Sequence, residues 1–271
     1  MKAAIMVVAF LVSYFLTPKT LLMLETGGLS RNNFLGNRIP SAGGIIFPAA
    51  LAITYGLLAL WGEIGPEAYI YLGFISLVGL AGLVDDIAGN KERSGFKGHF
   101  KDFFFHGRLT TGFWKAGLGG VIAALAATIE SISFGDFIVN FLIVALATNL
   151  FNLFDVRPGR SIKVFLISSI VIILFLPSYI ASILLIPLLG IVLAYGVYDI
   201  RSRAMMGDAG SNVIGMAVGL ALVAAGGGMG IKLMLLAGLI SLNVLSEYRS
   251  FSGYIEKNKV LYFLDLWGRR E

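Results

Sequence analysis

Residues 69–84 read YIYLGFISLVGLAGLV and are followed directly by Asp85 and Asp86. The run is apolar and predicts a membrane-spanning helix that ends in two adjacent carboxylates. Like charges side by side repel, and at a membrane boundary they also lose part of their hydration. Either the pair simply ends a span and faces water, or it faces a bound cation such as a divalent metal carrying phosphates.

The composition indicates a membrane protein. Of the 271 residues, 57% are hydrophobic and only 14% are charged, with a mean hydropathy of +0.85. A soluble domain carries about 25% charged residues. The chain has no cysteine, which excludes disulfides and thiolate metal sites. A net charge of +5 does not by itself indicate a nucleic-acid partner here. In a membrane protein the distribution of the basic residues between the two sides of the membrane matters more than their sum.

We expect an all-α polytopic membrane protein with nine transmembrane helices, since nine apolar stretches are separated by Gly, Pro or charged residues. One transmembrane domain, residues 1–246, is followed by a basic and aromatic tail, residues 247–271. The first stretch lacks a signal-peptide cleavage site, so we expect it to be retained. The expected spans are 3–23, 43–61, 68–84, 113–129, 136–152, 162–177, 179–198, 211–226 and 230–246.

The basic residues predict the orientation in the membrane. Of the 21 lysines and arginines, all but Lys2 and Lys232 fall on one side of these spans. The positive-inside rule makes that side cytoplasmic, so the N-terminus is expected outside and the C-terminus inside. The outer connections are short, and the active site is therefore expected on the cytoplasmic face.

The first cytoplasmic loop carries Arg31 and Arg38 ahead of Gly43 and Gly44, which open the second span. The arginines are candidate phosphate contacts. The glycines allow the backbone to come close either to a ligand or to a neighbouring helix. Interfacial anchoring and helix packing explain the same residues without a ligand.

Asn149, Asn152 and Asp155 are spaced i, i+3, i+6 at the inner end of the fifth span. On a helix this spacing places all three near one face. Amide and carboxylate oxygens are hard ligands suited to Mg²⁺. Polar contacts between packed helices are the competing explanation.

Gly207, Asp208, Gly210 and Ser211 lie where a short loop meets the start of a helix. We predict Ser211 as the N-cap. Free N–H groups at such an end bind phosphate oxygens, and Asp208 can hold a metal that bridges them. Asp208 as an ordinary capping residue is the alternative.

Metal ligands, cations and close-approach glycines together are the components of a phosphoryl-transfer site. Five motifs carry them in order along the predicted cytoplasmic face: residues 39–44 (IPSAGG), residues 82–86 (GLVDD), Lys115, residues 149–155 (NLFNLFD) and residues 206–211 (MGDAGS). They resemble the motifs of the polyprenyl-phosphate N-acetylhexosamine-1-phosphate transferases, glycosyltransferase family 4, which include the phospho-N-acetylmuramoyl-pentapeptide transferase of peptidoglycan synthesis.

The resemblance implies transfer of a sugar-1-phosphate from a UDP-sugar to undecaprenyl phosphate, with release of UMP. It also implies Mg²⁺, or Mn²⁺ in its place, and a multi-pass protein of the bacterial plasma membrane; a homodimer is one arrangement to consider. We assign Asp85, Asp86 and Asp155 to catalysis and Asn152 and Asp208 to the metal. The candidate substrate and phosphate contacts are Lys115, Asn149, Arg38, Gly43, Gly44, Gly207, Gly210 and Ser211.

Three departures from the family pattern concern the nucleotide-sugar side. Pro158 stands where the family has a second Asp after Asp155, no histidine follows His106, and the ninth span is the last where about ten is usual. A non-catalytic relative that binds polyprenyl phosphate, or a scaffold in envelope assembly, is therefore the alternative function. Basic tail residues such as Arg269 are candidates to replace the missing contacts.

Overall fold

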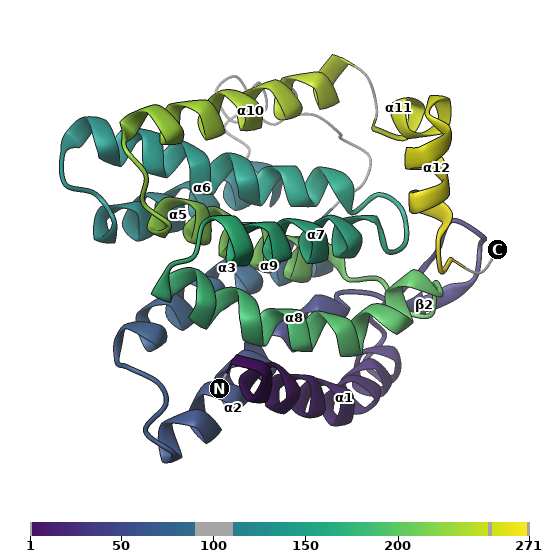
Figure 1. Ribbon diagram of the computed structural model, residues 1–271. Helices are drawn as coiled ribbons and strands as arrows, with labels where there is room; N and C mark the ends of the chain where they lie inside the picture. The colour runs from purple at the N-terminus through teal and green to yellow at the C-terminus, as the bar shows by residue number, and fades with distance from the viewer. Residues whose placement is uncertain (1, 90–110, 249–250, 270–271) are drawn as a thin grey trace.

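The computed structural model describes residues 2–89, 111–248 and 251–269, apart from the side chains of residues 111–115 and 247. Nine helices stand in the order and at the places where nine apolar stretches were expected (Figure 1). They are α1 (Lys2–Thr26), α2 (Ile46–Leu60), α3 (Glu67–Ala88), α5 (Thr111–Ile129), α6 (Phe134–Phe154), α7 (Arg160–Phe175), α8 (Tyr179–Ile200), α9 (Gly207–Ala224) and α10 (Met229–Tyr248).

Seven of the described helices are long and apolar enough to cross a membrane, which confirms the multi-pass prediction for those seven. Of the two others, α7 has 16 residues, whereas about 20 residues span the hydrocarbon core. Helix α5 has 19 residues, and its fully described part, Ala116–Ile129, is apolar. The orientation relative to the cytoplasm stays a prediction.

Helices α8 and α9 form the centre of the bundle. In each of them 78% of the most apolar window is buried, against 22% in α1 and 17% in α10. Outward-facing leucine, phenylalanine and methionine side chains on the peripheral helices, such as Phe15 and Met234, suit contact with lipid chains. The loops that precede and follow this central pair therefore start from the most buried helices of the bundle.

A short hairpin links α1 to α2. Its strands, β1 (Ser30–Asn32) and β2 (Arg38–Pro40), pair antiparallel, and a 3₁₀ turn, Gly43–Ile45, leads into α2. The Asn33 side chain closes the hairpin by accepting hydrogen bonds from the amides of Leu35 and Asn37. This Asx-type closure was not anticipated from the sequence.

The C-terminal tail forms two further helices, α11 (Phe251–Lys257) and α12 (Lys259–Leu266). In Figure 1 α12 runs across the end of the bundle, at the same end as β2. The opposite end holds Lys2, Glu63 and Ser178 around a small cavity. The described loops therefore lie at the two ends of the helix bundle, which we call its poles. The candidate residues on loops lie at the pole of α12.

Candidate active site

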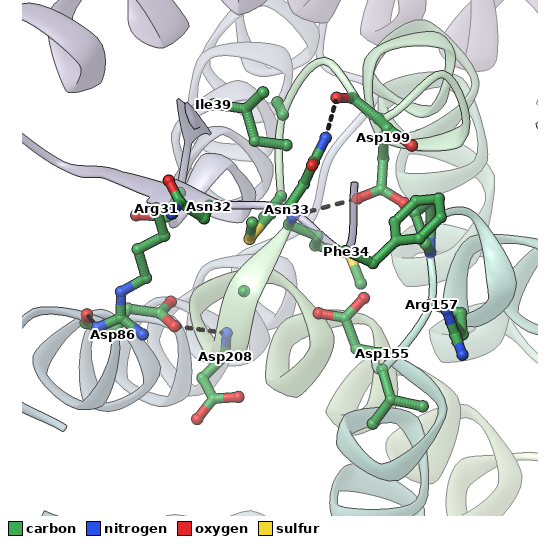
Figure 2. Close-up of a pocket in the computed structure, with 18 residues that line it drawn as sticks. Arg31, Asn32, Asn33, Phe34, Ile39, Asp86, Asp155, Arg157, Asp199 and Asp208 are labelled. Carbon is green, nitrogen blue, oxygen red and sulfur yellow. Dashed lines mark hydrogen bonds between the residues drawn. The ribbon is translucent and has the colours of Figure 1, made fainter. Parts of the chain in front are cut away.

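A cleft of about 430 Å³ opens at the pole of α12. Four segments far apart in the sequence line it: the hairpin, the end of α3, the loop after α6 and the loop that leads into α9. Figure 2 shows Asp86, Asp155 and Asp208 around the N-terminal end of α9. The prediction that the acidic motifs meet in one place thus holds for these three carboxylates.

Asp86 caps helix α9 from a neighbouring helix. Its Oδ1 accepts from the amide of Asp208 at 3.1 Å and its Oδ2 from the amide of Ala209 at 2.9 Å. A carboxylate at a helix N-terminus satisfies free N–H groups and interacts favourably with the helix dipole. The carboxylate of Asp86 thus occupies two of the N–H groups at the start of α9, and free N–H groups at this helix end had been expected to bind phosphate.

Glycines let the site segments come close together. Gly207 has a φ of +72°, and a Cβ there would lie 2.5 Å from Oδ2 of Asp86. A Cβ on Gly82 would meet the carbonyl of Asp208, and one on Gly44 would meet Gly210 backbone to backbone. The conformational freedom and small size of glycine are thus required where α3, the 3₁₀ turn and α9 meet.

Gly43 and Gly44 have protein partners for their amides, which donate to the carbonyls of Met205 and Met206 at 2.9 and 2.8 Å. Both glycines are buried. The structure accounts for them by packing, the second of the two explanations offered by the sequence, and their contact with phosphate stays a prediction.

Asn152 and Asp208, the predicted metal ligands, are direct neighbours. The Asn152 side-chain amide donates to Oδ1 of Asp208 and, at 3.2 Å, to the hydroxyl of Ser211. Ser211 is fully buried inside α9, which begins at Gly207, so the prediction of Ser211 as N-cap is wrong. The Ser211 hydroxyl instead accepts a hydrogen bond from the Asn152 side chain and so helps to orient it.

Asp155 lies at the C-terminal end of α6 and lines the cleft. Burial raises the pKa of its carboxyl well above the usual range, and the charges of Asp199, Asp208 and Asp86 raise it further, against a small opposing effect of the Gly207 amide. A bound cation would relieve this repulsion. Crowded carboxylates with perturbed pKa values are typical of functional sites.

Asn149 points elsewhere, toward α10. Its side chain donates to Oδ1 of Asn243 at 2.8 Å, and Asn243 in turn donates to the carbonyls of Leu146 and Leu239. Each step of three residues along a helix rotates the direction of the side chain by about 60°. The three side chains of the motif therefore point in successive directions, from α10 toward the cleft. Asn149 thus makes an interhelical contact, whereas Asn152 and Asp155 face the site.

Two other candidates, Asp85 and Arg38, are not among the described residues that line the cleft. Asp85 is half-buried on α3, and Arg38 is exposed on β2. The side chain of Lys115 lies outside the described part of the structure. Among the described residues, two arginines line the cleft: Arg31, which donates to the carbonyl of Asp86, and Arg157, which lies over the ring of Phe34 at 5.7 Å.

Asp199 is a cleft residue that the sequence analysis did not select. It lies in the last turn of α8, and its carboxylate accepts hydrogen bonds from the amides of Gly159 at 2.7 Å and Met206 at 3.2 Å. It therefore ties the loop after α6 to the loop before α9. The available signal was a carboxylate at the inner end of a very apolar helix, the same signal that singled out Asp85 and Asp86.

The donor set fits a hard divalent cation bound together with phosphates. Among the described residues no group of three His, Cys, Asp or Glu side chains is arranged to hold a metal by itself. Mg²⁺ typically takes one or two carboxylates and completes its shell with water and substrate phosphate. Asp208, with the amide oxygen of Asn152 after a side-chain flip and Asp155 nearby, suits that pattern.

Fold and cleft together define a helical multi-pass membrane protein with a carboxylate site at one pole. Residues 68–226, from α3 to the end of α9, match the model of glycosyl transferase family 4, and the chain belongs to that family of membrane sugar-1-phosphate transferases. The match includes Asp86, Asn152, Asp155 and Asp208 and leaves out the hairpin and the tail. No protein of curated function gives a match.

Proposed function

We propose that this protein transfers a sugar-1-phosphate, N-acetylhexosamine-1-phosphate by our expectation, from a UDP-sugar to undecaprenyl phosphate in the bacterial plasma membrane. The observation that carries the proposal is the Asn152–Asp208 pair beside Asp86 and Asp155 at the N-terminus of α9, within the matched part of the chain. Cell-envelope polysaccharide or glycolipid synthesis is the corresponding role.

In the proposed reaction an oxygen of the lipid phosphate attacks the sugar-bearing phosphorus of the donor. The new P–O bond joins lipid phosphate to sugar phosphate, the P–O bond to the nucleotide breaks, and UMP leaves with the electron pair. Since the second pKa of a phosphate monoester is about 6, the nucleophile is mostly dianionic at pH 7 and needs little help from a base. Positioning and charge neutralisation dominate such a reaction.

The residues divide these tasks. Asp208 and Asn152 would hold Mg²⁺, which when bound neutralises phosphate charge and favours in-line attack. Asp155 orients the same assembly from the end of α6. Asp86 fixes the N-terminus of α9, and with it the position of Asp208. Arg31 and Arg157 supply positive charge at the rim of the cleft.

The test is UMP release by the purified protein with undecaprenyl phosphate, Mg²⁺ and a panel of UDP-sugars. We expect turnover that EDTA abolishes and that Asp208→Asn lowers at least about 100-fold, as for loss of a group aimed at transition-state charge. The matched control is Glu256→Gln, an exposed carboxylate of the tail, which should retain full activity.

A non-catalytic relative is the second candidate, favoured by Pro158 in place of the second Asp of the family motif. If the protein is such a non-catalytic relative, it should bind undecaprenyl phosphate in a metal-dependent manner and turn over none of the donors. That result, obtained with folded protein, would refute the transferase.

A further inference from the structure

The C-terminal tail is tied to the bundle by a buried ion pair. Nε of Arg160, the first residue of α7, donates to Oδ1 of Asp265 on α12 at 2.8 Å, and its Nη2 donates to Oδ2 at 3.1 Å. Only 5% and 7% of the two side chains are exposed. Buried charges are tolerated when geometry is bidentate and remaining groups are satisfied, so this contact specifies one docked position of α12.

Two more basic residues hold the same end of α12, Arg269 through the carboxylate of Asp265 and Lys163 through backbone carbonyls. Arg269 donates from Nη2 to Oδ2 of Asp265 at 3.1 Å and to the carbonyl of Pro158 at 3.2 Å. Nζ of Lys163 donates to the carbonyls of Leu264 and Asp265 at 3.0 and 2.7 Å, which satisfies the C-terminal end of α12. The tail thus contacts both α7 and the loop that precedes it.

That loop, residues 155–159, begins with the cleft carboxylate and ends at the helix that holds the tail. It is fixed from the bundle side by Asp199, which accepts from the amide of Gly159. The tail fixes it through Pro158 and Arg160. At the start of the loop, Phe154 stacks on Phe251 of α11 with ring centroids 4.5 Å apart.

We propose that helices α11 and α12 hold the loop 155–159 in the conformation that places Asp155 in the cleft, with Asp265 as the positioning residue. If Asp265 loses its charge, the guanidinium groups of Arg160 and Arg269 stay buried without a counter-ion. They then turn toward water and release the N-terminus of α7 and the carbonyl of Pro158. The consequence for turnover rests on the proposed function; the consequence for the loop does not.

The chain contains no cysteine, so a single introduced cysteine reports on the loop directly. A nitroxide label at Val156→Cys, in the full-length protein in detergent, should show an immobilised spectral component. Asp265→Asn should remove that component. The matched control is Asp136→Asn, which breaks an equally buried pair with Lys232 (2.7 Å, 8% of each side chain exposed) at the other pole and should leave the label immobilised.

Arg269→Met serves as a milder variant that keeps the Arg160–Asp265 pair and loses the contact with Pro158. We expect part of the immobilised component to disappear, and this variant decides the outcome if Asp265→Asn does not fold. An unchanged label spectrum in the folded tail variants would overturn the proposal. Equal mobilisation by Asp136→Asn would do the same, because it would show general loosening.

Turnover gives the second readout. With the UDP-sugar that the wild type accepts, Asp265→Asn should lower kcat about 10- to 100-fold, the usual cost of losing an orienting partner, with KM nearly unchanged. Asp136→Asn should keep the wild-type kcat below its unfolding temperature. An unchanged kcat in Asp265→Asn counts against the positioning role. Absence of turnover in the wild type counts against the proposed function alone, and the label spectra still test the tail.

Discussion

At the scale of single residues, the carboxylates of the site have different roles within one cluster. Asp86 is committed to two backbone amides, Asp199 to two others, and Asp208 to the amide of Asn152. The carboxylate of Asp155 is repelled by the other three carboxylates. Two carboxylates therefore build the site, whereas Asp155 and Asp208 are the ones suited to a cation.

Asp86→Ala should destabilise the fold by about 0.5–2 kcal/mol, the range for loss of a helix N-cap. The amides of Asp208 and Ala209 lose their acceptor, and α9 loses a negative charge at its positive end. The unfolding midpoint in detergent measures the effect. Glu256→Gln, exposed on the tail, should stay within about 0.5 kcal/mol of wild type, and equal stability of the two variants would refute the capping role.

Asp155→Asn should stabilise the metal-free protein while it impairs turnover. Burial and neighbouring charges raise the pKa of Asp155 in the folded state above its pKa in the unfolded state. The free energy of unfolding therefore falls as the pH rises from the unfolded-state pKa to the folded-state pKa. Asparagine removes that cost. We expect a higher unfolding midpoint than wild type at pH 8 and convergence of the two below about pH 4.

Asp136→Asn is the comparison for this pH dependence, since it removes a carboxylate that is paired with Lys232. It should lower the midpoint at pH 8. A midpoint for Asp155→Asn below that of wild type at pH 8 would show that the repulsion among the cleft carboxylates is already relieved in the metal-free protein.

At the scale of helices, glycine contacts set how closely the site segments approach. Gly44→Ala would press a methyl group into the backbone of Gly210, and overpacking of this kind costs about 1–3 kcal/mol. The 3₁₀ turn and α9 would separate, so turnover should fall together with the unfolding midpoint. Both quantities are measured on the same detergent-purified sample.

Gly56→Ala on α2 is the matched control, because nothing lies within 4 Å of the added methyl group. Alanine in an open helical position gains about 0.5–1 kcal/mol over glycine. The opposite signs of the two substitutions test the packing account. A neutral Gly44→Ala would show that the two backbones do not touch.

The sequence predicted the helices more fully than the site, for a physical reason. Apolar runs bounded by charge identify helices, because backbone groups in a bilayer must be bonded within the helix. The direction of a side chain depends on neighbours far along the chain. Asn149 shares its motif with Asn152 yet faces Asn243, and no local pattern pairs Arg160 with Asp265, 105 positions apart.

At the scale of the whole molecule, the two poles differ in charge as a membrane protein requires. The pole with the cleft carries Arg31, Arg157 and the tail, and the opposite pole carries Lys2 beside Glu63. The positive-inside rule then predicts that the cleft faces the cytoplasm. The proposed function requires this orientation, since the proposed UDP-sugar donor would have to reach the cleft from the cytoplasm.

Single cysteines test that orientation without background, because the chain has none. Ile132, 97% exposed between α5 and α6, belongs to the pole predicted to face outward, and Glu256 belongs to the tail. In intact cells a membrane-impermeant thiol reagent should label Ile132→Cys and leave Glu256→Cys unlabelled until the membrane is permeabilised. The reverse pattern would place the cleft outside, away from cytoplasmic nucleotide-sugars, and would refute both the orientation and the proposed donor together.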